Sequence, residues 1–207
     1  MIRVDHLGDV CTITLDRPDK ANALTREMLL DVAVAVDQAA GTKALILTGT
    51  GRVFSAGADL EATKAGLATD PAWEKASGAI AGFDGLTVAA LNGTVAGGAF
   101  GVVLACDMRL AVPNANFFYP VMKMGFLPQP SDPGRMAALI GPSRAKMILM
   151  SGQKISAEEA LSWGLIDRIV PQDDLIVRAQ DLCRDALTAE AGHIARIKHM
   201  IPRISEG

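Results

Sequence analysis

Residues 87–106, TVAALNGTVAGGAFGVVLAC, contain the pattern that decides the fold: a strand, a glycine-rich loop and an apolar helix in direct succession. Residues 87–91 have the length and composition of a buried strand, and residues 99–106 are apolar throughout. Glycines in the intervening loop let the backbone approach a ligand, and the first N–H groups of the following helix have no partner within it. The stretch predicts a strand–loop–helix unit whose loop favours negative charge on a ligand.

An earlier stretch repeats this arrangement. Residues 43–48, KALILT, form a continuous apolar run typical of a strand buried on both faces, and the loop FSAGADL follows at residues 54–60. Each glycine cluster alone is also typical of an ordinary turn, and neither has the spacing of a dinucleotide-binding loop or a P-loop. If the two loops converge, their backbone N–H groups could form an oxyanion hole.

The remaining patterns predict a single α/β domain with helices in its last third. Further strands are expected at residues 10–15 and 108–112, and further helices at residues 25–40, 132–140, 143–150 and 156–164. Residues 61–80 are polar and interrupted by Gly66, Pro71 and Gly78, which predicts a mobile loop with one helical piece. Residues 113–133 contain five prolines and predict an irregular segment.

Composition excludes several functional classes. The 207 residues are 50% hydrophobic, only 4% aromatic, and carry a net charge of −3, so nucleic acid is not expected as a partner. Three cysteines and three histidines without ligand spacing predict buried thiols, with neither a metal site nor a disulfide framework. We find no signal-peptide pattern and no apolar run of membrane-spanning length, and therefore expect a cytoplasmic protein without membrane contact.

Four motifs occur in an order that resembles the crotonase (enoyl-CoA hydratase/isomerase) family. They are Asp16-Arg17-Pro18 with Asn22-Ala23-Leu24; residues 54–60; Asn92-Gly93 with Gly97-Gly98 and Cys106-Asp107; and residues 155–171, ISAEEALSWGLIDRIVP. The similarity extends from Val4 to about Lys198. Four ordered matches are far more specific than any one glycine cluster.

The resemblance implies a crotonase-like spiral of ββα units with a short helical C-terminal region. Residues 1–142 would form the spiral core and residues 143–207 the shortened helical region of one domain spanning 1–207. It also implies a homotrimer or a dimer of trimers, and a coenzyme A thioester as substrate or ligand, with no other cofactor. Because the chain stops at Gly207 shortly after Pro202, we expect little of the family's C-terminal cover over the site.

By the same resemblance, the backbone N–H groups of Ala58 and Gly98 form the oxyanion hole. Coenzyme A would contact Lys20, Ala21, Ala23 and the stretch from Ala58 through Asp59 to Leu60. The Asp59 side chain itself is expected to fix its loop.

The sequence lacks both glutamates that the family's hydratases use as acid and base. Gly101 stands at the first position and Val121 at the second, so ordinary hydration is not expected. Relatives with a shifted acid carry it where Gln129 stands here. Tyr119 and Asp132 are the candidate replacements, although Tyr119 could simply pack and Asp132 before Pro133 fits a helix N-cap.

Two functions from different classes remain open at this point. The chain could be an acyl-CoA enzyme of fatty acid metabolism, an isomerase, decarboxylase, hydrolase or hydratase-like lyase, with Tyr119, Ser131 or Asp132 assisting. It could also be a non-catalytic acyl-CoA-binding member that has lost the acid/base pair. Met122, Met124 and Met136 could line an acyl pocket, but their spacing favours ordinary core.

Overall fold

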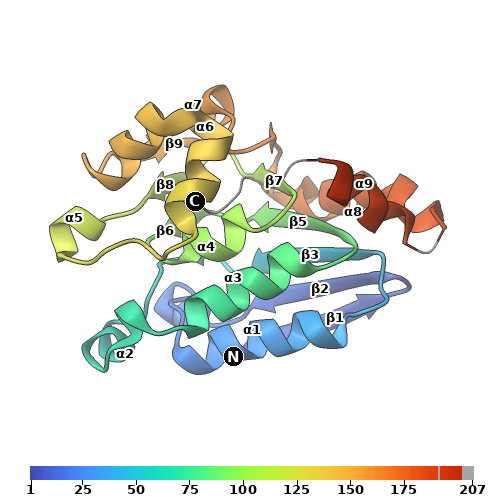
Figure 1. The fold of residues 1–207 in the computed structure, drawn as a ribbon, viewed down its shortest axis with the longest axis horizontal. Coiled ribbons are helices and arrows are strands. Elements are labelled where there is room, and N and C mark those ends of the chain that lie inside the picture. The colour runs from blue at the N-terminus through green and yellow to red at the C-terminus, as the bar shows by residue number, and fades with distance from the viewer. Residues whose placement is uncertain (191, 202–207) are drawn as a thin grey trace.

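The computed structural model describes residues 1–190 and 192–201 and shows two sheets surrounded by helices (Figure 1). Pro202 and the residues after it, at which we expected helix formation to end, lie outside the described residues. The strands are β1 (Ile2–Leu7), β2 (Val10–Leu15), β3 (Ala44–Gly49), β4 (Val53–Ser55), β5 (Leu86–Leu91), β6 (Thr94–Ala96), β7 (Met108–Ala111), β8 (Asn116–Phe118), β9 (Ile155–Ser156) and β10 (Arg168–Ile169).

Most helices are short, and three single turns are 3₁₀ helices. The α-helices are α1 (Arg26–Gln38), α2 (Leu60–Lys64), α3 (Ala72–Gly82), α4 (Ala99–Leu104), α5 (Val121–Met124), α6 (Asp132–Leu149), α7 (Ala157–Trp163), α8 (Leu175–Thr188) and α9 (His193–Met200). The 3₁₀ turns are η1 (Pro18–Lys20), η2 (Leu67–Thr69) and η3 (Gln172–Asp174).

The topology repeats one unit along the chain. The large sheet has the order β1-β2-β3-β5-β7-β10, and the small sheet has the order β4-β6-β8-β9. Each of the pairs β3/β4, β5/β6 and β7/β8 therefore places its first strand in the large sheet and its second in the small sheet before a helix follows. This alternation is the ββα spiral that the resemblance to the crotonase family implied.

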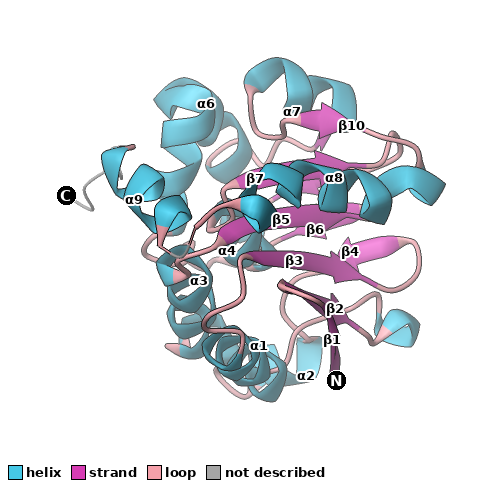
Figure 2. Cartoon of the chain, turned by 90° about the vertical axis from the view of Figure 1, so that its right-hand side faces the viewer, coloured by secondary structure: helices cyan, strands magenta, loops and turns pink. Residues whose placement is uncertain are grey.

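Within both sheets, neighbouring spiral strands are parallel, so the loops that follow them emerge at common edges. In the large sheet β2, β3, β5 and β7 pair in parallel, and in the small sheet β4, β6 and β8 do so. Helix α8 covers β3, β5 and β7 on one face, while α1 and α3 pack against each other elsewhere on the molecule (Figure 2).

The core is built from small and aliphatic side chains of the central strands. Residues 44–48 of β3 are all buried, as the continuous apolar run predicted. All three cysteines are buried free thiols, and burial raises the pKa of Cys106 to about 12, so that thiol stays protonated. Among the described residues, every helix is too short or too polar to cross a lipid bilayer.

Two segments are more ordered than the sequence patterns predicted. Residues 61–80 contain α2, η2 and most of α3, because Trp73, Ser77 and Ile80 fall at helical spacing and are buried on one face. Gly78 does not interrupt α3, because it lies on the exposed face of the helix while the opposite face is packed into the core. The proline-rich segment similarly contains β8 and α5.

Helix α6 joins the two helices that were expected at residues 132–140 and 143–150. Gly141 lies between them with φ +79° and ψ 158°, a left-handed conformation that bends the helix before Pro142. The two predicted helices are thus present as two helical segments that meet at a kink at Gly141.

Candidate functional site

The two glycine-rich loops meet at one edge of the small sheet. Strand β4 pairs with β6 in parallel, with Val53 opposite Thr94 and Ser55 opposite Val95. The loop at residues 56–59 therefore runs beside the loop at residues 97–98. Sequence motifs separated by about forty residues are brought together by this single strand pairing.

Backbone conformation fixes the geometry of both loops. Gly57 has φ +89°, and a Cβ atom there would lie only 2.7 Å from the carbonyl oxygen of Ala96 in the other loop. Ser55 Oγ accepts a hydrogen bond from the Gly57 N–H and donates one to the carbonyl of Asn22. Only glycine allows this close approach with this φ, so Gly57 sets the separation of the loops.

The N–H groups of Ala58 and Gly98 are both free in this arrangement. The neighbouring groups are paired, since Leu24 donates to the Gly57 carbonyl and Asp59 donates to the Leu24 carbonyl. Among the described residues, neither Ala58 N–H nor Gly98 N–H has a backbone or side-chain acceptor. Gly98 is also the N-cap residue of α4, where the helix dipole adds partial positive charge.

Ala58 and Gly98 line the same cavity, which has a volume of about 160 Å³. Its wall is mainly apolar and comes from five parts of the chain. The lining residues are Ala56, Ala58, Leu60, Thr63, Ala68, Trp73, Ala96, Gly97, Gly98, Phe118, Tyr119, Pro120, Val121, Met124, Phe126, Leu127 and Gln129. The two residues predicted to supply the oxyanion donors thus line one apolar chamber.

Trp73 in α3 is a wall residue that sequence reasoning missed. A Cβ atom at Gly98 would meet the Trp73 ring at 2.9 Å, so the indole packs directly against the Gly98 backbone. The indole Nε1–H donates to the Leu67 carbonyl, which holds the ring in place. The helical spacing of the buried α3 residues was the signal that could have identified it.

Only some of the residues predicted to contact coenzyme A line the cavity. Leu60 lines the cavity and is 72% exposed, whereas Lys20, Ala21 and Ala23 lie outside the cavity wall. Lys20 is exposed at the end of η1. Ala21 and Asn22 follow in left-handed conformations, with φ +50° and +52°.

Asp59 holds this region together. One carboxylate oxygen accepts a 2.7 Å hydrogen bond from Arg17, and the other accepts from the N–H groups of Glu61 and Ala62 at the start of α2. The Arg17 hydrogen bond is the main reason why the pKa of Asp59 is lowered. Both oxygens are therefore occupied within the protein, so the side chain fixes the loop, and the backbone N–H and carbonyl of Asp59 are also paired, with Leu24 and Thr63.

No carboxylate lines the cavity among the described residues. Gly101, at the first expected glutamate position, is buried in α4, and Val121, at the second, is an apolar wall residue. Gln129 lines the cavity, but its side-chain amide donates to the Ala68 carbonyl. Tyr119 is the only ionisable side chain in the wall.

Tyr119 both packs and makes a polar contact. Its ring stacks on Phe100 with centroids 5.5 Å apart, and only 3% of the residue is exposed. Its hydroxyl donates a 2.8 Å hydrogen bond to Asp132 Oδ2 and accepts a weaker one from the backbone N–H of Gln129. Burial is the main cause that raises the pKa of Tyr119, followed by the nearby Asp132 carboxylate, so the phenol is protonated at neutral pH.

The side chain of Asp132 does not cap α6, so its interpretation as a helix N-cap was wrong. Ser131 is the cap residue and already has helical angles, φ −82° and ψ −16°, so the helix begins one residue earlier than the Asp-Pro pattern predicted. Asp132 is fully buried and its carboxylate contacts Tyr119. Burial raises the pKa of Asp132 to about 7, and the Glu74 carboxylate adds to this effect, while Tyr119 and Arg135 oppose it.

The three methionines considered as acyl-pocket residues, Met122, Met124 and Met136, differ in how deeply they are buried. Met136 is fully buried in the core, as its spacing predicted. Met122 and Met124 are 63% and 48% exposed, so ordinary core was the wrong interpretation for them. Met124 lines the cavity with Phe126 and the 85%-exposed Leu127, which together form an apolar rim.

The chain matches a known protein family over most of its length. Residues 6–206 match the family model described as enoyl-CoA hydratase/isomerase. The chain is 34% identical over 209 residues to the carnitinyl-CoA dehydratase of Salmonella enteritidis PT4, a match that covers 96% of this chain and 79% of the relative.

Solved structures share the fold. An enoyl-CoA hydratase subunit I from Geobacillus kaustophilus superposes with a TM-score of 0.87 at 30% identity, covering 97% of this chain and 80% of that chain. A protein described as a putative enoyl-CoA hydratase/carnitine racemase from Magnetospirillum magneticum superposes with a TM-score of 0.90 at 28% identity, covering 98% and 82%.

Proposed function

Because the chain belongs to the crotonase, or enoyl-CoA hydratase/isomerase, family, we propose that it binds an acyl-CoA thioester and stabilises the enolate of that thioester. The observation that supports this most directly is the pair of free N–H groups, at Ala58 and Gly98, facing one apolar cavity. A thioester oxygen placed between them would accept two hydrogen bonds that strengthen as negative charge develops on it.

The proposed chemistry is a proton transfer at the carbon next to the thioester. Removal of that proton creates an enolate, whose oxyanion the two N–H groups stabilise, and a proton can return to the same or a conjugated carbon. Tyr119 is the proposed acid/base because it is the only ionisable side chain in the described cavity wall. The names of the relatives, a carnitinyl-CoA dehydratase and an enoyl-CoA hydratase, support a CoA thioester as the substrate. The missing carboxylates at Gly101 and Val121 favour reactions that need one proton-transfer group, such as isomerisation.

The acyl group is proposed to be short. A cavity of about 160 Å³ with an apolar wall is close to the volume that accommodates one benzene molecule, about six carbon atoms.

The experiment is to incubate the protein with C4–C12 acyl-, enoyl- and malonyl-type CoA esters in D₂O. Binding is measured by calorimetry, and hydrogen–deuterium exchange at the α-carbon by mass spectrometry, because exchange detects the enolate whatever the net reaction is.

Replacing Gly98 by proline tests the oxyanion hole. Proline removes the N–H, and its ring fits the observed φ of −59°. Gly98→Ala is the matched control, because its Cβ also meets Trp73 but its N–H is retained. We expect Gly98→Pro to lower the exchange rate by about 10²–10³-fold relative to Gly98→Ala. Equal rates in the two variants would contradict the assignment of Gly98.

A non-catalytic acyl-CoA-binding protein is the second candidate, and the absence of carboxylates from the described cavity wall favours it. The same experiment separates the two. Binding of an ester without α-carbon exchange would identify a binding protein. The absence of binding by every ester would contradict both functions.

A further inference from the structure

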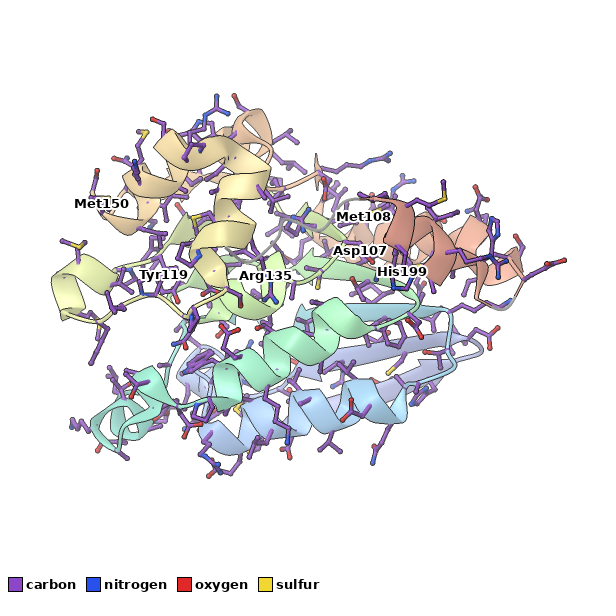
Figure 3. All side chains as sticks on the ribbon, viewed as in Figure 1. Asp107, Met108, Tyr119, Arg135, Met150 and His199 are labelled. Atoms are coloured by element: carbon purple, nitrogen blue, oxygen red, sulfur yellow. The ribbon has the colours of Figure 1, made fainter. Side chains whose placement is uncertain are left out.

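A polar cluster lies beside the cavity, where helices α4 and α6 meet, and Tyr119 is its one member in the described cavity wall. It contains Asp132, Arg135, Glu74 and the hydroxyl of Tyr119. Asp132 and Arg135 come from the first turn of α6, and Glu74 comes from α3. Figure 3 shows Tyr119 and Arg135 in this central part of the molecule.

Two atoms of this cluster have no hydrogen-bond partner. Asp132 Oδ1 and Arg135 Nη1 are buried, and neither makes a hydrogen bond with the described part of the chain. Leaving a buried carboxylate oxygen unpaired is destabilising, and more so when the group is charged. A fully buried aspartate with one unpaired oxygen therefore lowers the stability of the fold unless the group carries a proton. Such a group is retained where it has a functional role.

The free oxygen of Asp132 occupies the space next to Gly101. A Cβ atom built on Gly101 would lie 3.0 Å from Asp132 Oδ1, tighter than ordinary van der Waals contact. Any side chain at position 101 would thus compete with this carboxyl group. The position where the family's first glutamate would begin is filled by a carboxyl group from another helix.

We propose that Asp132 is a positioning residue that orients Tyr119 and takes up its proton, replacing from α6 the carboxylate missing at Gly101. This inference rests on the proposed function, which supplies the substrate. The choice of residues rests on the geometry of Tyr119, Asp132 and Gly101. Asp132 is absent from the cavity wall, so it acts through the phenol.

The proton transfer balances as a relay. In the forward step the C–H bond of the substrate breaks, and the proton goes to the Tyr119 oxygen. The original phenol proton passes to Asp132 Oδ2 along the 2.8 Å hydrogen bond, so the tyrosine remains neutral. The reverse sequence returns a proton to carbon. The charged groups that face Asp132 set its proton affinity: Glu74 favours the protonated form and Arg135 the ionised form.

The sequence offers a direct probe, because Tyr119 is the only tyrosine in the 207 residues. Protein labelled with [¹³Cζ]tyrosine will give one phenol carbon resonance. We expect its chemical shift to titrate between about pH 5 and 9, as Asp132 gains or loses its proton. In Asp132→Asn, which retains an acceptor but cannot take up the proton, the resonance should stay constant over this range.

Asp107→Asn is the matched control. Asp107 accepts hydrogen bonds from Thr87 and pairs with Lys198, and it lies outside the cavity wall. This variant also removes a carboxylate with several partners, yet the ¹³C titration should persist in it. A constant resonance in the unmodified protein, or an unchanged titration in Asp132→Asn, would overturn the proposal even if no turnover were ever found.

The kinetic arm uses the α-carbon exchange assay. Asp132→Asn should bind the ester with unchanged affinity and exchange its α-hydrogen about 10²-fold or more slowly. Exchange by this variant should also lack the pH dependence that the unmodified protein shows. Unchanged exchange in Asp132→Asn would overturn the proposal. Failure of the unmodified protein to bind any ester would instead overturn the proposed function, while the ¹³C titration would still test the role of Asp132.

Discussion

At the scale of single residues, Asp132 is the buried carboxyl group on which the proposed chemistry depends. Its carboxyl group is fully buried, one oxygen is unpaired, and burial raises its pKa from 3.8 to about 7. The folded state therefore binds this proton more tightly than the unfolded chain does. Its contribution to stability is complete below about pH 4 and is lost as the pH rises toward 7.

This shift predicts an unusual pH dependence of stability. Relative to the unmodified protein, Asp132→Asn should gain stability as the pH rises from 4 to 8, by up to about 4 kcal/mol, since each pKa unit corresponds to about 1.4 kcal/mol. Urea unfolding at several pH values measures the difference. A difference that is independent of pH would contradict it.

Asp59→Asn provides a contrast with the opposite sign. The pKa of Asp59 is lowered, mainly by its hydrogen bond with Arg17, so its stabilisation is present above the unfolded pKa and is lost as the pH falls below about 4. The same titration series should therefore show the cost of Asp59→Asn disappearing at acidic pH.

At the scale of elements, the β4–β6 pairing brings the two loops together and Gly57 lets them touch. Gly141 in the bend of α6 can be compared with Gly57, because both have a positive φ but different surroundings. Both glycines have left-handed backbones, with φ of +89° and +79°. A Cβ atom at Gly57 would collide with the Ala96 carbonyl, whereas one at Gly141 would meet nothing within 4 Å.

Alanine at these two glycines should separate backbone strain from loop position. We expect Gly141→Ala to lose about 1–3 kcal/mol of stability, because φ +79° with ψ 158° is a backbone conformation essentially restricted to glycine, with α-carbon exchange unchanged. Gly57→Ala should lose more stability and also most of the exchange activity, because Ala58 N–H must move. Thermal unfolding and the exchange assay measure both effects, and equal exchange in the two variants would contradict this role of Gly57.

Local patterns predicted the elements better than they predicted side-chain directions. The glycine-rich loops and the buried run of β3 follow from neighbouring residues, so their sequences sufficed. The direction of the Asp132 side chain depends on where α6 begins and on the space left by Gly101 in α4. Both depend on contacts between residues far apart in the sequence, so an Asp-Pro pair alone cannot predict them. Trp73 was missed because Gly66 and Gly78 suggested a loop where long-range packing stabilises a helix.

At the scale of the whole molecule, Lys198 connects the last described helix to the spiral. Its ammonium group pairs with Asp107 at 2.8 Å and donates to the carbonyls of Phe83 and Gly85. Figure 3 shows Asp107 beside α9. Only 14% of the Lys198 side chain is exposed, so these contacts are shielded from water.

Lys198→Met should therefore be destabilising, because it keeps the aliphatic stem and leaves two carbonyls without their donor. We expect a loss of about 1–3 kcal/mol in urea unfolding. Lys64→Met is the control, since Lys64 and its partner Glu61 are 74% and 81% exposed, and it should cost less than about 1 kcal/mol. Similar costs for the two variants would contradict a structural role for Lys198.

The contact between Gly101 and Asp132 also has an evolutionary consequence. A mutation that restored glutamate at position 101 would have to displace a buried carboxyl group whose oxygen lies 3.0 Å from the new Cβ. A mutation that removed Asp132 first would leave Tyr119 without its acceptor. Either change alone therefore disturbs the site, whereas glutamate at position 101 together with a small side chain at position 132 removes the steric conflict between them.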